Sequence, residues 1–502
     1  MVCGVLPFKI GLEIYSRLWA LDNFLERGND TMEPIKTEIL VLGAGPGGYA
    51  AAFYAADRNK QVTLVEQNAR LGGICLNAGC IPSKALLHAT ALLRESKASA
   101  ARGIEFAPAK IDLDKLRAWK DSILEKLGGG IKTLAQKRNV QVIHGRGHFE
   151  ASQTLRVETP EGQKFINYET AIIAVGSKPA MPSAFDLGNK RIMTSTEALE
   201  ISDIPADLLI VGGGYIGMEL GTVYAALGSQ VVVLEALQSI LPGLDPDLLR
   251  PVSRFAQRAF KEVRVNTKVI KMATAGKQIK VTTQQDKEQR DELYDRVLVS
   301  VGRVSNCSDL GLQNTQVKRD DKGFIITNTQ QQTDDPHVYA IGDVSGGVLL
   351  AHRAAKQARI AVEAILGETS VFEDIVVPAV VYTDPEIAWC GLTETDAKEK
   401  SIEIKTAKFL WGASGRALTL DRPDGMTKLV IEPDSERILG VGIVGHGAGE
   451  LISEGVLAVE MGATARDIAD SIHPHPTLSE TLMEAAETFY GTATHTLTRK
   501  NS

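Results

Sequence analysis

Two cysteines five residues apart are the feature of this 502-residue sequence best suited to do chemistry. Cys75 and Cys80 lie in the segment Gly-Gly-Ile-Cys-Leu-Asn-Ala-Gly-Cys-Ile-Pro-Ser-Lys, just downstream of a glycine-rich turn. The thiolate is the reactive form of cysteine, so a thiol pair that faces a redox cofactor can exchange electrons with it. The placement predicts such a pair, and two buried structural thiols are the alternative.

The spacing of the two cysteines also constrains the backbone. Residues i and i+5 of a regular helix have Cα atoms roughly 8–9 Å apart, whereas a disulfide needs them within about 7 Å. A bridge between Cys75 and Cys80 would therefore require a distorted backbone, which Asn77, Gly79 and Pro82 can supply. Because proline is favoured in the first turn of a helix, regular helix is expected to begin near Pro82.

The glycine-rich turn upstream has the pattern of a dinucleotide site. An apolar run at 39–42 leads into Gly-x-Gly-x-x-Gly, an Ala-rich segment follows, and a second apolar run at 62–65 ends in an acid. Such glycines let backbone approach a pyrophosphate, the helix N-terminus stabilises its charge, and the acid can bind ribose hydroxyls. The residues concerned are Gly43, Gly45, Gly48 and Glu66.

The same pattern occurs a second time. Apolar runs at 208–211 and 231–234 flank another Gly-x-Gly-x-x-Gly turn, and the acid again lies 23 residues after the first glycine. The residues concerned are Gly212, Gly214, Gly217 and Glu235. Glu235 suits a free ribose 2′-hydroxyl, and the next three residues include no Arg to bind a 2′-phosphate. The second site is therefore predicted to take NAD, not NADP.

The two copies differ in length. A third apolar run ends at Gly176 in the first copy and at Gly302 in the second, 133 and 90 residues after the respective first glycine. The cysteine segment falls within the longer copy. We expect two nucleotide-binding units of the same design, with the redox-active cysteine segment inserted into the first unit.

A histidine near the C-terminus is a candidate base. His475 precedes Pro476, which could open a helix that places Glu480 about one turn in. A carboxylate could then hold one ring nitrogen while the other accepts a proton. A capped surface turn is the alternative.

Composition excludes several classes of protein. Charged residues make up 23% of the chain and hydrophobic residues 44%, as in ordinary globular proteins, and the net charge of −7 offers no basic surface to nucleic acid or anionic lipid. Five cysteines form no secreted disulfide framework, so a cytoplasmic location is expected. Charged residues such as Lys9 and Glu13 interrupt residues 1–32, which predicts no membrane span but an extension outside the fold.

Other segments carry coarser structural signals. Residues 82–102 and 112–138 have helical patterns, the second interrupted at Gly128-Gly129-Gly130. Residues 268–299 are expected to form short strands, with the charged stretch 286–292 at a solvated hairpin tip. Residues 338–343 should form a strand that ends in Asp343, followed by a glycine-containing turn and an Ala-rich helix.

From about Thr37 onward the chain resembles the dihydrolipoamide dehydrogenases, the E3 components of 2-oxo-acid dehydrogenase complexes. The cysteine segment with its Ile-Pro-Ser-Lys ending, and segments 214–220, 340–343 and 475–477, fall in that family's order. The resemblance implies an α/β fold of two Rossmann-like domains plus a C-terminal α+β interface domain. It divides the chain into an extension (1–32), an FAD-binding domain (33–182), an NAD-binding domain (183–302), a central domain that completes the FAD site (303–372), an interface domain (373–490) and a tail (491–502).

The resemblance also assigns roles to residues. Cys75 would exchange with substrate and Cys80 would face the flavin, with His475 as a base oriented by Glu480. An ion pair beside flavin N5 would consist of Lys84 and Glu219. The FAD site would be lined by Gly43, Gly45, Gly48, Glu66, Gly72, Gly73, Cys75, Lys84, Gly147, Gly176, Ser177, Asp343 and Ala351. The NAD site would be lined by Gly212, Gly214, Gly217, Glu219, Glu235, Val269 and Gly302. No metal is expected.

The family's partners follow from the same resemblance. It implies a homodimer in which His475 serves the partner subunit's site, and the substrate dihydrolipoamide would be carried on a lipoyl-bearing E2 subunit or H-protein. The chain departs from the family's usual residues at Ser305, Arg353, Gln357 and Ala358, none of which removes a reacting group.

Other enzymes of similar design are rivals to this reading. A glutathione reductase is expected to have basic residues near Glu235, and a mercuric reductase is expected to have a cysteine pair at its C-terminus. A soluble transhydrogenase is expected to lack the redox cysteines. A non-catalytic, FAD-stabilised assembly subunit is the alternative from a different class.

Overall fold

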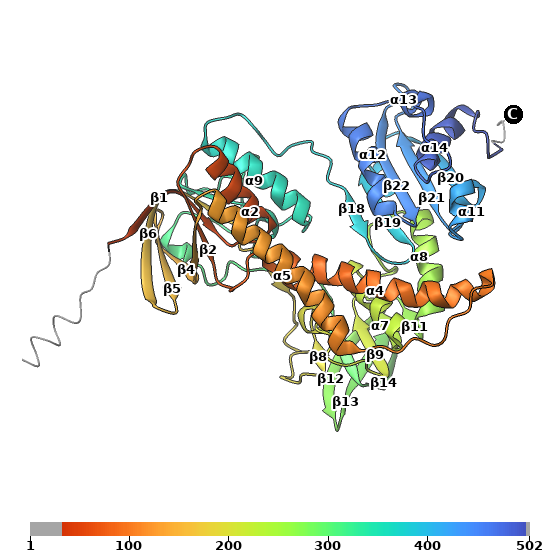
Figure 1. Ribbon diagram of the computed structural model, residues 1–502, viewed down its shortest axis with the longest axis horizontal. Coiled ribbons are helices and arrows are strands. Elements are labelled where there is room, and N and C mark those ends of the chain that lie inside the picture. Colours follow the sequence, from red (N-terminus) through yellow and green to blue (C-terminus); the bar gives the residue numbers. More distant parts are fainter. Residues whose placement is uncertain (1–32, 498–502) are drawn as a thin grey trace, which may run out of the picture.

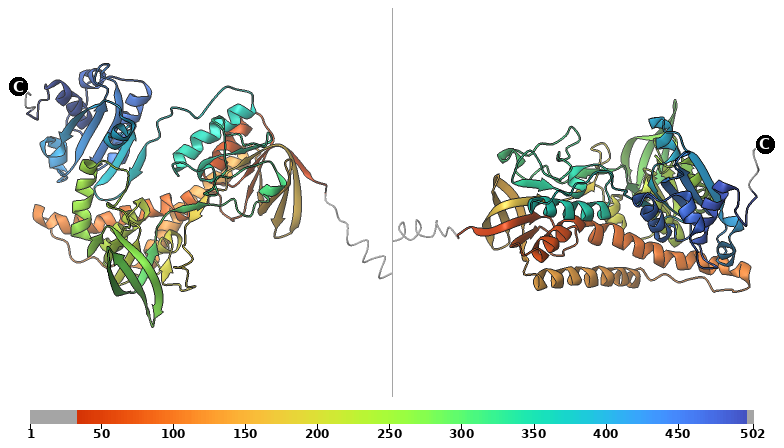
Figure 2. Two further views of the ribbon diagram at one scale, coloured as in Figure 1. Left: turned by 180° about the vertical axis from the view of Figure 1, so that it is seen from behind. Right: turned by 90° about the horizontal axis from the view of Figure 1, so that it is seen from above.

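The computed structural model describes residues 33–497, which form three units arranged around one long helix (Figure 1). The helix, α4 (Cys80–Ala98), leaves the first unit and packs on α7 (Tyr215–Leu227) of the second. It runs beside α5 (Leu113–Lys137) along one side of the molecule (Figure 2). Among helices of the described residues, none is long and apolar enough to cross a membrane.

The first unit is built on a seven-stranded sheet. Five strands are parallel: β1 pairs with β2 and β6, β2 also pairs with β3, and β6 also pairs with β17. Strands β5 and β4 continue from β6 as an antiparallel meander. Helices α2 and α9 pack on each other and α5 packs on α2. Their bounds are β1 (Ile35–Leu42), α2 (Pro46–Asp57), β2 (Val62–Glu66), β3 (Gln141–His144), β4 (Arg146–Ala151), β5 (Thr154–Thr159), β6 (Gly162–Ile173), β17 (Val338–Ala340) and α9 (Ala351–Ile365).

The second unit repeats the design on a five-stranded parallel sheet, in the order β11-β10-β9-β15-β8. A three-stranded antiparallel sheet, β12-β13-β14, packs near it through a shared apolar cluster. Bounds are β8 (Ile192–Met193), α6 (Ser195–Ala198), β9 (Asp207–Val211), β10 (Gln230–Leu234), α8 (Pro246–Ala259), β11 (Glu262–Arg264), β12 (Thr267–Ala275), β13 (Gln278–Gln285), β14 (Glu288–Tyr294) and β15 (Arg296–Val299). The predicted strands in 268–299 are confirmed. Of the stretch 286–292 expected at the hairpin tip, only residues 286–287 form the turn, because residues 288–292 pair with β13 as part of β14.

The internal repeat is confirmed by the order of the elements. β1, α2 and β2 correspond to β9, α7 and β10, and β6 and β15 are the third strands that end before Gly176 and Gly302. Between β2 and β6 the first copy carries three α-helices, α3 (Gly73–Ala78), α4 and α5. Between β10 and β15, the second copy has α8 as its one α-helix. The cysteine segment lies in this insertion, as expected.

The C-terminal unit is a five-stranded antiparallel sheet with helices. Its strand order is β18-β19-β22-β21-β20, and α12 packs on β22 while α14 packs on β20 (blue in Figure 1). Bounds are β18 (Ala379–Val381), β19 (Glu386–Gly391), α10 (Glu394–Lys400), β20 (Lys405–Leu410), α11 (Gly415–Thr419), β21 (Met426–Ile431), β22 (Ile438–Gly445), α12 (Ala448–Glu460), α13 (Ala465–Asp470) and α14 (Glu480–Tyr490). A two-stranded pair, β7 (Ser177–Pro179) and β16 (Arg303–Ser305), links the first two units.

Two predicted helix starts require correction. Helix α4 begins at Cys80, not near Pro82, because Pro82 sits in the first turn, where its missing N–H breaks no helical hydrogen bond. Helix α14 begins at Glu480, not at Pro476, which follows a cis peptide bond and stays outside the helix.

Helix α5 is not interrupted at its three glycines. A side chain at buried Gly128 would meet Arg70 Cγ at 2.7 Å, so glycine is needed there for Arg70 to lie across the helix. Glycine costs a helix about 1 kcal/mol relative to alanine, and the packing of α5 on its neighbours outweighs that preference.

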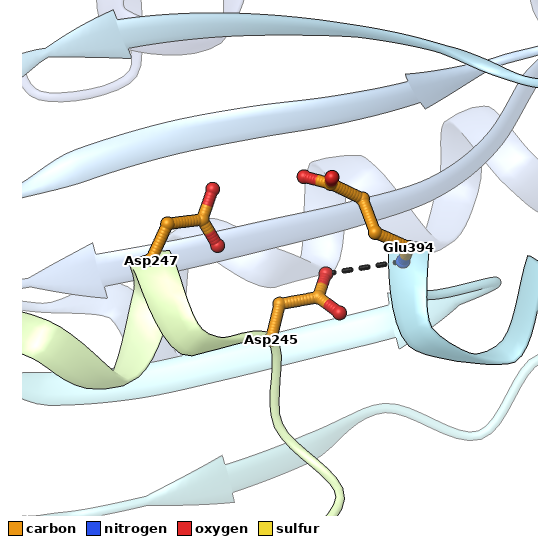
Figure 3. A group of neighbouring side chains, drawn as sticks. All are labelled: Asp245, Asp247 and Glu394. Carbon is orange, nitrogen blue, oxygen red and sulfur yellow. Dashed lines mark hydrogen bonds between the residues drawn. The ribbon is translucent and has the colours of Figure 1, made fainter. Parts of the chain in front are cut away.

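An ion cluster centred on buried Lys428 and Asp245 joins the second unit to the C-terminal unit. Asp245 and Asp247 at the start of α8 meet Glu394 at the start of α10 (Figure 3). Lys428 of β21, 1% exposed, lies 2.6 Å from Asp245, 2.9 Å from Asp247 and 2.9 Å from Glu394, and Lys408 lies 2.7 Å from Asp247. Burial opposes the charged form of Asp247, but the bonds from both lysines prevail and lower the pKa of that carboxyl to about 2. The cluster is thus an ion-pair network that fixes α8 against the C-terminal sheet.

Replacing Lys428 with Met should strongly destabilise the protein. Removal of one partner leaves buried charges uncompensated, which typically costs about 3–5 kcal/mol. The free energy of unfolding in urea, followed by circular dichroism, measures the loss. Lys398→Met, at an exposed position of α10, is the matched control and should stay within about 0.5 kcal/mol. Equal stability of the two variants would show that the cluster contributes little.

Candidate active site

One cavity brings most of the predicted residues together. Its volume is about 490 Å³, and its walls come from the ends of β1, β2 and β6, from α2, α3, α4 and α7, and from the turn before α9. Predicted residues that line it are Gly43, Gly45, Glu66, Gly73, Cys75, Cys80, Lys84, Gly147, Gly176, Ser177, Glu219, Asp343 and Ala351. Gly48 and Gly72 lie outside its lining and support the backbone that forms it.

The two cysteines occupy a break between helices. Cys75 lies in α3 and Cys80 is the first residue of α4, and Gly79 between them has φ −152° and ψ −112°, outside the helical region. Asn77 fixes α3 by donating to the carbonyls of Leu71 and Gly73. The expected distortion is therefore present, and it places the two thiols close enough for each to shift the pKa of the other.

The thiols are electrostatically unequal. The hydrogen bond from Cys75 and the charge of Lys84 lower the pKa of Cys80 to about 7, against the effects of burial and of Glu219. The same pairing, together with burial, raises the pKa of Cys75 well above its usual range. When both are reduced, Cys80 is the thiolate and Cys75 retains its proton.

Lys84 and Glu219 form the ion pair predicted for this site. Lys84 Nζ lies 2.8 Å and 3.1 Å from the two carboxylate oxygens of Glu219, whose side chain is 5% exposed. Lys84 is one turn along α4 from Cys80, and Glu219 projects from α7 of the second nucleotide unit. The pair therefore places a fixed positive charge beside the thiolate.

The glycine turn at the start of α2 provides the binding surface for an anion. No side chain caps α2, so its first N–H groups remain for a ligand. Glu66 accepts from the N–H groups of Ala44 at 2.8 Å and Asn68 at 2.9 Å, which fixes the turn. A Cβ at Gly48 would lie 1.8 Å from the carbonyl oxygen of Gly43, so only glycine permits this approach of helix and strand.

The opposite wall of the cavity is a hydrogen-bonded cluster. Ser177 donates to Asp343, and Arg303 donates through Nε to Ser177 Oγ at 2.7 Å and through Nη2 to its carbonyl oxygen at 2.8 Å. Gln357, one of the departures from the family pattern, accepts from Gly342 N–H at 2.9 Å. The turn that carries Asp343 is thus held from two sides.

The residues predicted for the second nucleotide surround the C-terminal edge of the second parallel sheet. Gly212, Gly214 and Gly217 form the turn between β9 and α7, again without a side-chain cap, and Gly302 follows β15. Glu235 at the end of β10 is buried and accepts from Gly213 N–H at 2.8 Å, as Glu66 does from Ala44. Val269 lies on the neighbouring strand β12.

His475 and Glu480 meet as predicted, but away from this cavity. His475 Nδ1 lies 2.9 Å from Glu480 Oε1, and the imidazole is 73% exposed. Burial opposes ionisation of Glu480, yet bonds from Thr477 N–H and His475 lower the pKa of that carboxyl. His473 differs, because both its ring nitrogens are bonded, to Ser471 and Glu454. His475 is not among the residues that line the cavity of its own chain.

Several residues at the site were not predicted from the sequence. Tyr215, in the second glycine turn, and Arg303 line the first cavity. Tyr382, just after β18, donates its N–H to Glu219 Oε1 at 3.0 Å. The sequence could have indicated Tyr215, because it is a large aromatic residue inside a glycine motif. No sequence pattern marks Tyr382 as part of the site.

These residues fit a flavin dinucleotide in the cavity. The glycine turn with its uncapped helix suits a pyrophosphate, buried Glu66 suits a ribose, and the thiol pair and Lys84 face the same space. The residues of the second turn fit NAD, since Glu235 replaces the basic residues that a 2′-phosphate requires.

Gly48→Ala should abolish flavin retention. The added methyl group would overlap the Gly43 carbonyl, so the turn would have to open. Absorbance of the purified protein measures the flavin bound per chain. Gly129→Ala, in α5, is the matched control because nothing lies within 4 Å of its added Cβ, and it should retain full flavin. Normal flavin content in Gly48→Ala would contradict this account of the turn.

Comparisons with known proteins agree with this geometry. Residues 37–358 match the family model described as pyridine nucleotide-disulphide oxidoreductase, and residues 377–486 match its dimerisation domain. The chain is similar to dihydrolipoyl dehydrogenases of Vibrio parahaemolyticus, at 42% identity over 92% of this chain and 97% of that protein, and of Staphylococcus aureus, at 41% identity over 92% and 99%.

Solved structures show the same likeness. LpdA from Mycobacterium tuberculosis matches with a TM-score of 0.83 at 27% identity, covering 90% of this chain and 99% of that one. The HOCl-induced flavoprotein disulfide reductase RclA from Escherichia coli, solved as a Cu(II) complex, matches with a TM-score of 0.81 at 26% identity over 90% and 99%. The chain belongs to the pyridine nucleotide-disulphide oxidoreductase family.

Proposed function

We propose that this protein is a dihydrolipoyl dehydrogenase that oxidises protein-bound dihydrolipoamide to lipoamide and reduces NAD+ to NADH. The observation that carries the proposal is the joining of a dithiol, a fixed cation and a dinucleotide turn in one cavity. Near full-length similarity to dihydrolipoyl dehydrogenases supports the choice of substrate.

The chain's own residues account for the thiol chemistry. His475, held through Nδ1 by Glu480, takes a proton at Nε2 from one thiol of dihydrolipoamide. The resulting thiolate attacks Cys75 of an oxidised Cys75–Cys80 pair, breaks that disulfide and forms a mixed disulfide. The second substrate thiol then attacks the mixed disulfide, which closes the lipoyl ring and releases Cys75. Two electrons have passed from the substrate to the cysteine pair.

Cys80 is the thiol that leaves as the thiolate, because its pKa is lowered and Lys84 stabilises its charge. Bound FAD would supply the two-electron link between the cysteine pair and NAD+, so that the Cys75–Cys80 disulfide is restored when NAD+ is reduced. The expected flavin ligands are the cavity residues given above, and the second glycine turn with Glu235 would hold NAD.

We further propose a homodimer in which the partner's His475 completes each site. The matched dimerisation domain, the exposure of His475 and its absence from the lining of its own chain's cavity support this arrangement. The lipoyl group would come from an E2 subunit or H-protein. The domain division at residues 33–182, 183–302, 303–372 and 373–490, and a cytoplasmic location, belong to the same proposal.

Anaerobic titration with dihydrolipoamide tests the function directly. We expect the flavin spectrum to develop long-wavelength absorbance from the Cys80 thiolate, which disappears when NAD+ is added and NADH forms. Cys75→Ser and Cys80→Ser should each lose this turnover and keep FAD. A flavin spectrum that does not change with dihydrolipoamide, but changes with NADPH and then with glutathione disulfide, would identify a different reductase of the same family.

His475→Gln should lower turnover of dihydrolipoamide by roughly 10²–10⁴-fold, the usual contribution of a general base. His473→Gln is the matched control and should lose less than about tenfold, since that ring is a structural link to Glu454. A similar loss in both variants would point to damage of the loop instead of removal of a base.

Mixed dimers decide where the base acts. A heterodimer of one Cys75→Ser chain and one His475→Gln chain has one complete site if the base acts across the interface, and no complete site if it acts within its own chain. Recovered activity in the heterodimer is expected; its absence would place His475 in its own subunit's site.

A further inference from the structure

Tyr382 belongs to the C-terminal unit, yet it contacts the ion pair of the cysteine site. Its ring centroid lies 4.4 Å from Lys84 Nζ, and its backbone N–H donates to Glu219 Oε1 at 3.0 Å. The Lys84 ammonium therefore lies against a carboxylate and also against an aromatic face. An ammonium within about 6 Å of such a ring is attracted by the negative potential of its face.

The segment that carries Tyr382 is fixed independently. Two residues on, Asp384 accepts from Arg94 Nε at 2.9 Å and pairs with Arg422 of the C-terminal unit. Arg94 lies on α4, the helix that begins at Cys80 and carries Lys84. Residues 382–384 thus contact α4 at two points, so the ring is held in place relative to Lys84.

We propose that Tyr382 is a positioning residue that holds the Lys84 ammonium between its ring and Glu219, and so makes the C-terminal unit part of the cysteine site. The inference rests on the proposed role of Cys80 as the thiolate beside the flavin. Its consequence is electrostatic: a fixed ammonium stabilises the Cys80 thiolate, and a mobile one stabilises it less.

Other ionisable groups face the same region and must be the same in all the proteins that are compared. They come from α3, α7, β19, α12 and the turn before α9. These groups are Cys75, Tyr215, Glu219, Asp343, Glu386 and Glu450.

The test is a pH titration of the flavin-loaded Cys75→Ser protein, in which Cys80 cannot form a bridge. Long-wavelength absorbance reports the Cys80 thiolate against the flavin, and its midpoint gives the pKa of Cys80 without substrate or turnover. Tyr382→Phe keeps the aromatic face and should leave the midpoint unchanged. Phenylalanines with increasing fluorine substitution at position 382 keep the shape but weaken the face, and should raise the midpoint stepwise, by about 0.4 unit or more at full fluorination.

The sign follows from the charge. Weaker attraction frees Lys84, the thiolate loses stabilisation and the pKa of Cys80 rises, so less thiolate is present at a pH below the midpoint. A purely structural role of Tyr382 would change the amount of bound flavin or the absorbance at high pH, and not the midpoint. Tyr382→Leu, if it folds, should match the fully fluorinated variant.

Lys84→Met provides the control for mechanism. It should raise the midpoint by itself, and substitutions at Tyr382 should then have no further effect, because the ring acts only through that ammonium. A midpoint that stays constant across the fluorinated series, or that shifts equally with and without Lys84, would overturn the inference. Absence of any titrating absorbance in the Cys75→Ser protein would instead reject the proposed pairing of Cys80 with flavin.

Discussion

The ion pair between Lys84 and the buried carboxylate of Glu219 lies where three parts of the chain meet. Lys84 comes from the helix inserted into the first nucleotide unit, Glu219 from the first helix of the second, and the N–H that orients Glu219 from the C-terminal unit. A buried charge must be paired and hydrogen-bonded, or it is costly. All of these bonds to Glu219 are made only when the three units are docked, and the cysteine site depends on that docking.

Helix α4 transmits this constraint through the molecule. Cys80 at its start lies in the cavity, Lys84 one turn later meets the second unit, and Arg94 binds Asp384 beyond it. Its apolar residues Leu86 and Leu87 belong to a core cluster that also includes β9, α7 and the C-terminal sheet. The ion cluster around Lys428 joins the second unit to the C-terminal unit at another place. A rigid frame of this kind suits chemistry between two thiols, where small displacements change reactivity.

Much of the fold could be predicted from local sequence. Each glycine turn, with flanking strands and a terminal acid, is a local pattern, and the structure shows both copies with Glu66 and Glu235 bonded to the turn in the same way. The insertion that carries the cysteines was located by comparing the lengths of the copies. Helix boundaries were less predictable, because the uninterrupted α5 depends on Arg70 packing over Gly128 and the start of α14 on the chain's path before Glu480.

The sequence by itself determined the reacting groups: a thiol pair in a backbone that glycine can distort, and a histidine five residues from its carboxylate. These are short-range patterns, whose geometry is set by neighbours in the chain. Only the tertiary structure decided which distant groups surround them, such as Tyr382 over Lys84, Arg303 on Ser177, and His475 exposed away from the cavity of its own chain. Such contacts arise from the packing of whole units, and no local pattern records which faces will meet.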